Sequence, residues 1–181
     1  MQRSILAGLA AAAAALILAQ GALAGPAAPA VPTDIAVPEG HKPYLVAHAD
    51  GVQIYDCVSV PGGYAWRLAA PRATLTDDQG KTVASHYGGP TWEARDGSKV
   101  VGKRDGFKTV DPTAIDWLRL AADSTTAGAD GDRFTDTTYI QRINTAGGLA
   151  PAAPDCTEDS MAERREIPYT ADYVFFKATG S

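Results

Sequence analysis

Hydrophobic positions change their spacing twice along this chain. Residues 5–19 form an almost unbroken apolar run rich in alanine, and prolines then interrupt residues 25–38. From about residue 44 onward, apolar and polar residues alternate in short segments. Alternation with a period of two is typical of half-buried strands, because successive side chains of a strand point to opposite faces. The pattern therefore predicts a leader, a linker and then a β-rich domain.

Turn signals divide the first half of this domain into short pieces. In 51–60, Val52, Ile54 and Asp56 alternate with Gln53, Tyr55 and Cys57, and further strands are expected at 65–68, 72–76, 82–86, 91–94 and 99–103. The turns between strands are predicted at Asp50-Gly51, Pro61-Gly62-Gly63, Asp78-Gln79-Gly80, Gly88-Gly89-Pro90, Asp96-Gly97 and Asp105-Gly106. This half of the chain is therefore expected to form an antiparallel meander.

The second half has one ambiguous segment. Residues 114–122 fit an amphipathic helix after Pro112, but they also alternate as a strand, and we favour the strand. Longer strands are expected at 135–144 and 169–177. The prediction is one all-β domain with about nine to eleven antiparallel strands and little helix outside the leader. It would be a sandwich or barrel-like.

The apolar run has the features of a secretory leader. Arg3 precedes the run, and Ala22-Leu23-Ala24 provides a small-x-small cleavage pattern, which predicts a mature chain beginning at Gly25. The alternative is an uncleaved anchor, although a membrane span needs about 20 apolar residues. We expect a signal peptide at 1–24, a Pro/Ala-rich tether at 25–43 and one β domain at 44–178. After cleavage no membrane span is expected, and the protein would be periplasmic or extracellular.

The net charge limits the class of partner, and the cysteine count predicts a disulfide. The full chain has a formal net charge of -5, and loss of Arg3 makes it -6. This acidic balance argues against nucleic acid as the main partner. Cys57 and Cys156 are the only cysteines, and an even number in an exported chain predicts one disulfide.

Several familiar chemical motifs are missing. No two glycines stand two positions apart, so the dinucleotide fingerprint G-x-G-x-x-G is absent. The P-loop, G-x-S-x-G and H-E-x-x-H patterns are absent too, and the three histidines lack the spacing of a zinc motif. We therefore expect no cofactor and no metal, and the sequence disfavours an NAD-dependent dehydrogenase.

The most concentrated chemistry lies in residues 86–94. This segment holds His86, Tyr87, Trp92 and Glu93 around a glycine-proline turn, with Asp96 just beyond it. Trp92 could stack on a sugar or other small molecule while Glu93, Asp96 or His86 acts as acid or base. The alternative, which we favour, is that Trp92 fills the core and Glu93 faces water.

A second group of candidate binding residues lies on the two late strands. Arg142 and Asn144 share one face of the strand at 139–145, and a buried Arg142 would need a carboxylate such as Asp172 or Glu93. Tyr169 and Asp172 complete the group. A polar pocket and a structural ion pair both fit, and the structural pair is favoured.

Four segments in order resemble the signature blocks of domain of unknown function 3455. They are Gly51–Cys57, His86–Ala94, Tyr139–Thr145 with Gly147-Gly148, and Pro168–Tyr173. The resemblance covers about residues 44–177 and implies one exported domain, with no catalytic residue to transfer. Some fungal relatives carry the name malate dehydrogenase, but the missing glycine fingerprint and the leader argue against that activity here.

Two functions remain open from the sequence. The first is a non-catalytic binding or envelope-associated module for a glycan or small molecule, because no nucleophile or metal constellation is recognisable. The second is an extracytoplasmic hydrolase or lyase that uses Glu93, Asp96 or His86. The position of the candidate side chains tests these hypotheses: if they meet in one open cleft a functional site is indicated, and if they are scattered or packed without a cavity their roles are structural.

Overall fold

The structure is a computed structural model that describes residues 25–180, so the predicted leader lies outside the described residues. Its strands are β1 (His41–Val60), β2 (Gly63–Thr76), β3 (Thr82–Tyr87), β4 (Thr91–Ala94), β5 (Lys99–Lys108), β6 (Trp117–Thr126), β7 (Thr137–Gly147) and β8 (Arg164–Ala178). Two short 3-10 turns, η1 (Thr33–Ile35) and η2 (Ala153–Asp155), are the helical elements of this part of the chain. The predicted all-β class is confirmed.

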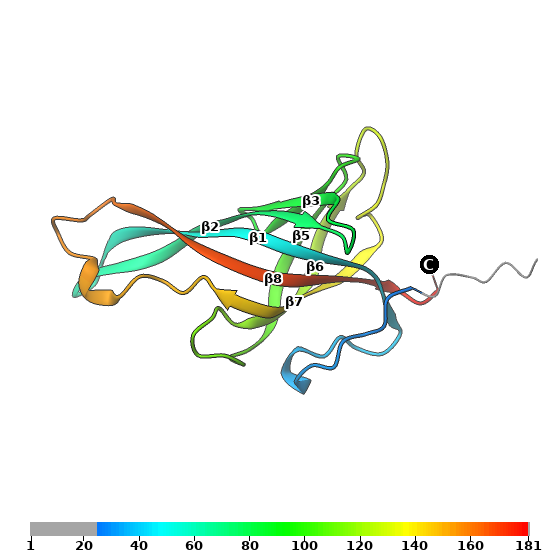
Figure 1. The fold of residues 1–181 in the computed structure, drawn as a ribbon, viewed down its shortest axis with the longest axis horizontal. Coiled ribbons are helices and arrows are strands. Elements are labelled where there is room, and N and C mark those ends of the chain that lie inside the picture. The colour runs from blue at the N-terminus through cyan, green and yellow to red at the C-terminus, as the bar shows by residue number, and fades with distance from the viewer. Residues whose placement is uncertain (1–24, 181) are drawn as a thin grey trace, which may run out of the picture.

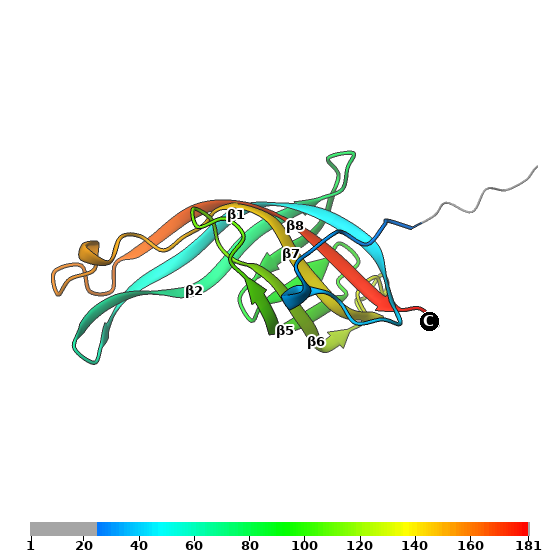
Figure 2. The same cartoon turned by 90° about the horizontal axis from the view of Figure 1, so that it is seen from below.

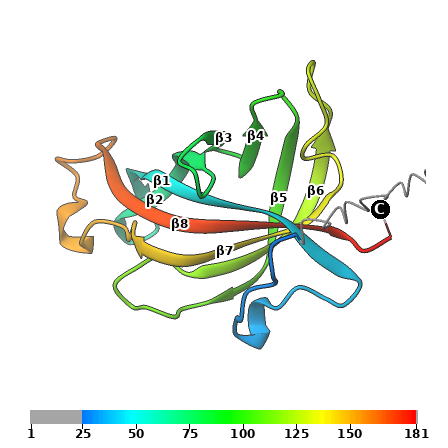
Figure 3. The same ribbon diagram turned by 45° about the vertical axis from the view of Figure 1, so that its right-hand side comes forward.

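All eight strands belong to one antiparallel sheet. Each strand pairs with the next in sequence, and β8 pairs back with β1, so the sheet closes on itself as a ring (Figures 1 and 3). The sheet is thus single and ring-like rather than two packed layers. Residues 25–180 contain eight strands and not nine to eleven, since the strands expected at 65–68 and 72–76 are parts of one long strand, β2.

Two predicted turns are wrong, and glycine explains both. Gly51 lies inside β1, where a Cβ would stand 2.1 Å from the carbonyl oxygen of Arg72 on β2. Gly106 lies inside β5, where a Cβ would stand 2.6 Å from the carbonyl oxygen of Asp34. Both glycines permit a close approach of a second backbone, which is the other common use of this residue.

The ambiguous segment 114–122 divides in two. Residues 109–116 connect β5 to β6, and the strand begins only at Trp117. Leu118 and Leu120 point toward the main core, as the strand alternative requires. The helix alternative is therefore wrong.

The segment predicted as a tether is packed against the ring over part of its length. Ile35 is fully buried in a cluster with Val174 and Phe176. The carbonyl oxygen of Ile35 accepts a 2.7 Å hydrogen bond from Nε2 of Gln141, and Arg119 donates to the carbonyl oxygen of Ala36. Apolar residues among the prolines thus give this segment a buried face.

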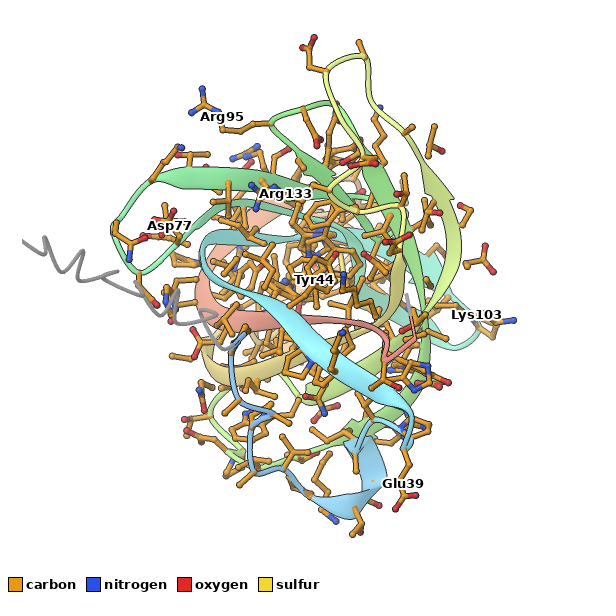
Figure 4. All side chains as sticks on the ribbon, turned by 90° about the vertical axis from the view of Figure 1, so that its right-hand side faces the viewer. Glu39, Tyr44, Asp77, Arg95, Lys103 and Arg133 are labelled. Atoms are coloured by element: carbon orange, nitrogen blue, oxygen red, sulfur yellow. A yellow bond between two sulfur atoms is a disulfide. The ribbon has the colours of Figure 1, made fainter. Side chains whose placement is uncertain are left out.

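The strand directions place the connections at two opposite ends of the ring. Residues 61–62, 88–90, 109–116 and 148–163 lie at one end, and 77–81, 95–98 and 127–136 lie at the other, near both described termini. Figure 4 looks at the terminal end and shows Tyr44 among the side chains that fill the ring. Tyr44 donates or accepts a 2.6 Å hydrogen bond with Thr137, and burial raises its pKa to about 12. This end of the ring is filled.

At the opposite end an arm extends beyond the ring; it consists of the β1–β2 hairpin at residues 55–68, the beginning of β8 at 164–167 and the β7–β8 connection at 148–163 (Figures 1 and 2). The predicted disulfide Cys57–Cys156 is present, with a Cα–Cα distance of 5.5 Å. It packs in a small core with Tyr55 and Trp66. The disulfide therefore ties the β7–β8 connection to the β1–β2 hairpin. Within residues 25–180, no helix is long and apolar enough to cross a membrane.

Candidate functional site

A cavity of about 320 Å³ lies in the ring at the base of the arm. Strands β1 to β8 and the connections 88–90 and 109–116 supply its walls, which are formed by Gln53, Leu68, Ala69, Ala70, Pro71, His86, Gly88, Gly89, Pro90, Trp92, Arg104, Asp116, Leu118, Leu120, Arg142 and Tyr173. Leu68 and Arg104 are exposed at its mouth, whereas Gln53, Trp92 and Tyr173 are almost completely buried. The cavity thus runs from the surface to a buried floor, and its volume is at the small end of the range for ligand sites.

Three rings form the floor. The His86 ring stacks on Trp92 with centroids 4.2 Å apart, and Tyr173 meets both rings edge-on at 5.1 and 5.3 Å. Strand pairing explains the contact, because His86 stands opposite Trp92 in the β3–β4 hairpin. Trp92 is 1% exposed and belongs to the main core. It therefore has no free face on which a sugar could stack.

His86 is held as a neutral imidazole. Burial lowers its pKa to about 4, and the charge of Arg142 acts in the same direction. Its Nδ1 lies 2.8 Å from the carbonyl oxygen of Thr91, which can only accept, so Nδ1 carries the proton. Nε2 therefore keeps a lone pair, and no described residue donates a hydrogen bond to it. His86 brings an acceptor, not a charge, to the cavity.

Arg142 brings a positive charge to the same cavity. Its Nε and Nη2 donate to the carbonyl oxygen of Asp116 at 3.1 and 2.8 Å. The predicted ion pair of Arg142 with Asp172 or Glu93 is wrong, because among the described residues Arg142 forms no ion pair. The Asp172 carboxylate is instead hydrogen-bonded to His48 and Asn144, at 2.7 Å in each case. The guanidinium is thus held by a main-chain carbonyl and not by a carboxylate.

Two further buried donors have no partner. Nε2 of Gln53 and Nε1 of Trp92 are inaccessible to water and make no hydrogen bond within the described part of the chain. An unpaired buried N–H group costs about 1–3 kcal/mol. Both residues lie in the cavity wall. Because neither nitrogen is accessible, both N–H groups are unpaired inside the protein and do not reach the cavity surface.

Glu93 and Tyr87 lie outside the cavity. Tyr87 donates a 2.7 Å hydrogen bond to Glu93, which holds the carboxyl pKa below its usual value, and Nζ of Lys99 is 3.4 Å from the same carboxylate. Glu93 neighbours Trp92 in β4, so the pleat directs the two side chains to opposite faces. The structure thus separates Glu93 from His86.

Asp96 supports a loop at the filled end of the ring. Its carboxylate accepts hydrogen bonds from the backbone N–H and the hydroxyl of Ser98 at 2.9 and 2.6 Å, and from the backbone N–H of Arg133 at 3.0 Å. These bonds tie the β4–β5 turn to the β6–β7 connection. Asp96 is therefore at the end of the ring away from the cavity and from His86.

The remaining candidates also take structural contacts. Asn144 is exposed and has a positive φ of 52°, while its Nδ2 donates to Asp172. Tyr169 is 2% exposed, and its hydroxyl lies 3.4 Å from that of Tyr173. No described group of three or more His, Cys, Asp or Glu side chains is arranged to hold a metal ion. Of the predicted site residues, His86, Trp92 and Arg142 meet in the cavity.

Sequence reasoning missed several cavity residues. Gln53 sits between apolar neighbours in β1, and a buried amide in a strand is a signal that could have marked it. Tyr173 alternates with Tyr169 and Ala171 on the inner face of β8, a pattern visible in the sequence. Arg104 carries no comparable signal, because it is an exposed arginine among other basic residues.

The comparisons with known proteins agree with the resemblance seen in the sequence. A family model described as protein of unknown function (DUF3455) matches residues 38–177. No curated protein and no solved structure matches the chain. The matched range contains all the residues that line the cavity, from Gln53 to Tyr173. The chain therefore belongs to the DUF3455 family of proteins of unknown function.

Proposed function

We propose that this protein is an exported binding module that holds a small molecule in the cavity at the base of the arm. One observation carries the proposal: the cavity combines apolar walls with a positive Arg142 that has no carboxylate partner. A concave apolar pocket with a few convergent polar groups is the usual form of a ligand site. The neutral His86 adds a hydrogen-bond acceptor at the floor.

Export is supported by two independent features. The sequence begins with the pattern of a cleavable leader. The Cys57–Cys156 disulfide is typical of an oxidising compartment outside the cytoplasm. We therefore propose that the module functions in the periplasm or outside the cell.

An acid–base hydrolase or lyase is supported less well. A glycosidase would need a pair of carboxylates that flank the substrate, roughly 5–9.5 Å apart. Asp116 is the carboxylate residue in the cavity wall, and it accepts a 2.6 Å hydrogen bond from Thr109. Glu93 and Asp96 bind other partners away from the cavity. The geometry thus favours binding over catalysis.

A blocked cavity provides the test. In Ala70→Phe a ring replaces the small side chain of a cavity residue, and in the matched control Ala121→Phe the same change is made on β6 at a position outside the cavity wall. Both variants and the mature wild type would be screened by thermal shift against glycans, organic acids and lipids.

We expect ligands that stabilise the wild type and Ala121→Phe but not Ala70→Phe. At a free ligand concentration of one hundred times Kd, binding adds about 2.7 kcal/mol to the free energy of unfolding, which raises Tm by about 5–10 °C in a domain of this size. Ligands that stabilise all three proteins equally would contradict the proposal, and so would a broad screen without any ligand.

A further inference from the structure

The charges in the cavity wall do not cancel. Arg104 and Arg142 are positive, Asp116 is negative, and His86 is neutral, so the wall carries one net positive charge. The chain as a whole carries a formal charge of -5. A recess with a net positive charge favours an anion over a neutral molecule of the same shape, because only the anion is attracted to that charge.

The two arginines occupy different depths. Arg104 is exposed at the mouth, where its guanidinium lies 5.4 Å from the centre of the Phe107 ring. Arg142 is half-buried, and a main-chain carbonyl fixes its orientation through two hydrogen bonds. A guanidinium held in this way is preorganised, so a ligand does not have to order it. Arg104 is placed to attract an anion and Arg142 to hold it.

Most of the remaining wall is apolar. Leu68, Leu118 and Leu120 contribute to it together with Ala69, Ala70, Pro71 and Pro90. Such walls would not compensate a molecule that is charged or polar along its whole length. They fit a ligand with a polar group at one end and a hydrocarbon body at the other.

We infer that the ligand is a small monocarboxylate with an apolar body, bound with its carboxylate at Arg142; this inference rests on the proposed function. One negative charge matches the single positive charge of the wall, which a doubly charged phosphate would exceed. Carboxylate is also the planar anion whose two oxygens suit the fork of a guanidinium.

Matched probes separate charge from shape. Phenylacetate and phenylacetamide share one apolar body and nearly the same volume, but only the acid is charged at pH 7. Binding of each to the mature protein would be measured by isothermal calorimetry, with acetate as a probe that lacks the body. The variants are Arg142→Gln and Arg142→Lys, and the control Arg67→Gln removes the same charge from an exposed position on β2 outside the cavity.

We expect phenylacetate to bind at least tenfold more tightly than phenylacetamide and acetate. Arg142→Gln should weaken phenylacetate at least tenfold and leave phenylacetamide unchanged, Arg142→Lys should retain part of the affinity, and Arg67→Gln should match the wild type. The acid and amide comparison uses the unaltered protein, so it holds even where a variant at Arg142 fails to fold.

Equal affinity for the acid and the amide would overturn the inference. If that shared binding were lost in Ala70→Phe, the cavity would still be a binding site and only the carboxylate would be wrong. Absence of phenylacetate binding at millimolar concentration would also overturn the inference. In that case the proposed function would stand or fall on the separate thermal-shift screen.

Discussion

Removal of the Cys57–Cys156 disulfide should destabilise the whole domain and not only the arm. The two cysteines are 99 residues apart in sequence, and the loop between them contains β2 to β7. In the chain-entropy model, closing a loop of about 100 residues limits the unfolded state enough to stabilise the fold by about 4.7 kcal/mol. For a domain of this size each kcal/mol shifts Tm by about 2–4 °C. The expected decrease in Tm is therefore about 9–19 °C.

The assay compares the oxidised mature protein with the double variant Cys57→Ala/Cys156→Ala by calorimetry, with and without a reducing agent. The reducing agent should lower the Tm of the wild type and leave the variant unchanged. Since Cys57 is fully buried and Cys156 is 6% exposed, the variant also loses some packing with Trp66. A loss of less than about 3 °C would refute the reasoning, because the disulfide would then hold only the local connection.

Two other predictions concern single positions in β1. Gly51→Ala should lower the free energy of unfolding in urea by at least about 2 kcal/mol, because its Cβ would stand 2.1 Å from a backbone oxygen of β2. The control Gly88→Ala, whose Cβ has an ordinary 3.4 Å contact, should lose less stability. Equal losses in the two variants would contradict this explanation. Hydrogen bonds to Asp78 and, to a lesser extent, Asp172 raise the pKa of His48 in the folded protein. Protonated His48 therefore stabilises the fold, by less than about 1 kcal/mol at this half-exposed site. This stabilisation is fully present below the unfolded pKa near 6.5 and is lost as the pH rises through the folded pKa. Wild type should thus lose more stability than His48→Gln between pH 5.5 and 8.5, and identical pH profiles would disprove it.

Local patterns predicted the strands better than they predicted the turns. Asp96-Gly97 is a true hairpin turn, with Gly97 at a φ of 82°. The strands expected on either side of it, at 91–94 and 99–103, pair with each other as β4 and β5. Asp50-Gly51 has the same letters but lies within β1, because a neighbouring strand passes too close for any side chain there. A turn glycine and a close-contact glycine are alike in sequence. Only the partner strand distinguishes them, and that contact is long-range.

The candidate site could be predicted in part for a similar reason. His86 and Trp92 belong to one hairpin, so sequence proximity brought them together correctly. Glu93 is adjacent in sequence, yet the pleat places it on the other face beside Tyr87. Arg142 reaches the same cavity from β7 only because the sheet closes into a ring. Which late strand faces which early strand depends on that closure, and no local pattern encodes it.

The most direct test of the central claim is a crystal structure of the mature protein grown with phenylacetate. We predict that the ligand lies in the cavity at the base of the arm, with its carboxylate within hydrogen-bond distance of Arg142 and its ring against Leu118 and Leu120. Phenylacetate bound elsewhere on the protein, or a cavity that holds only water at saturating ligand, would contradict the claim.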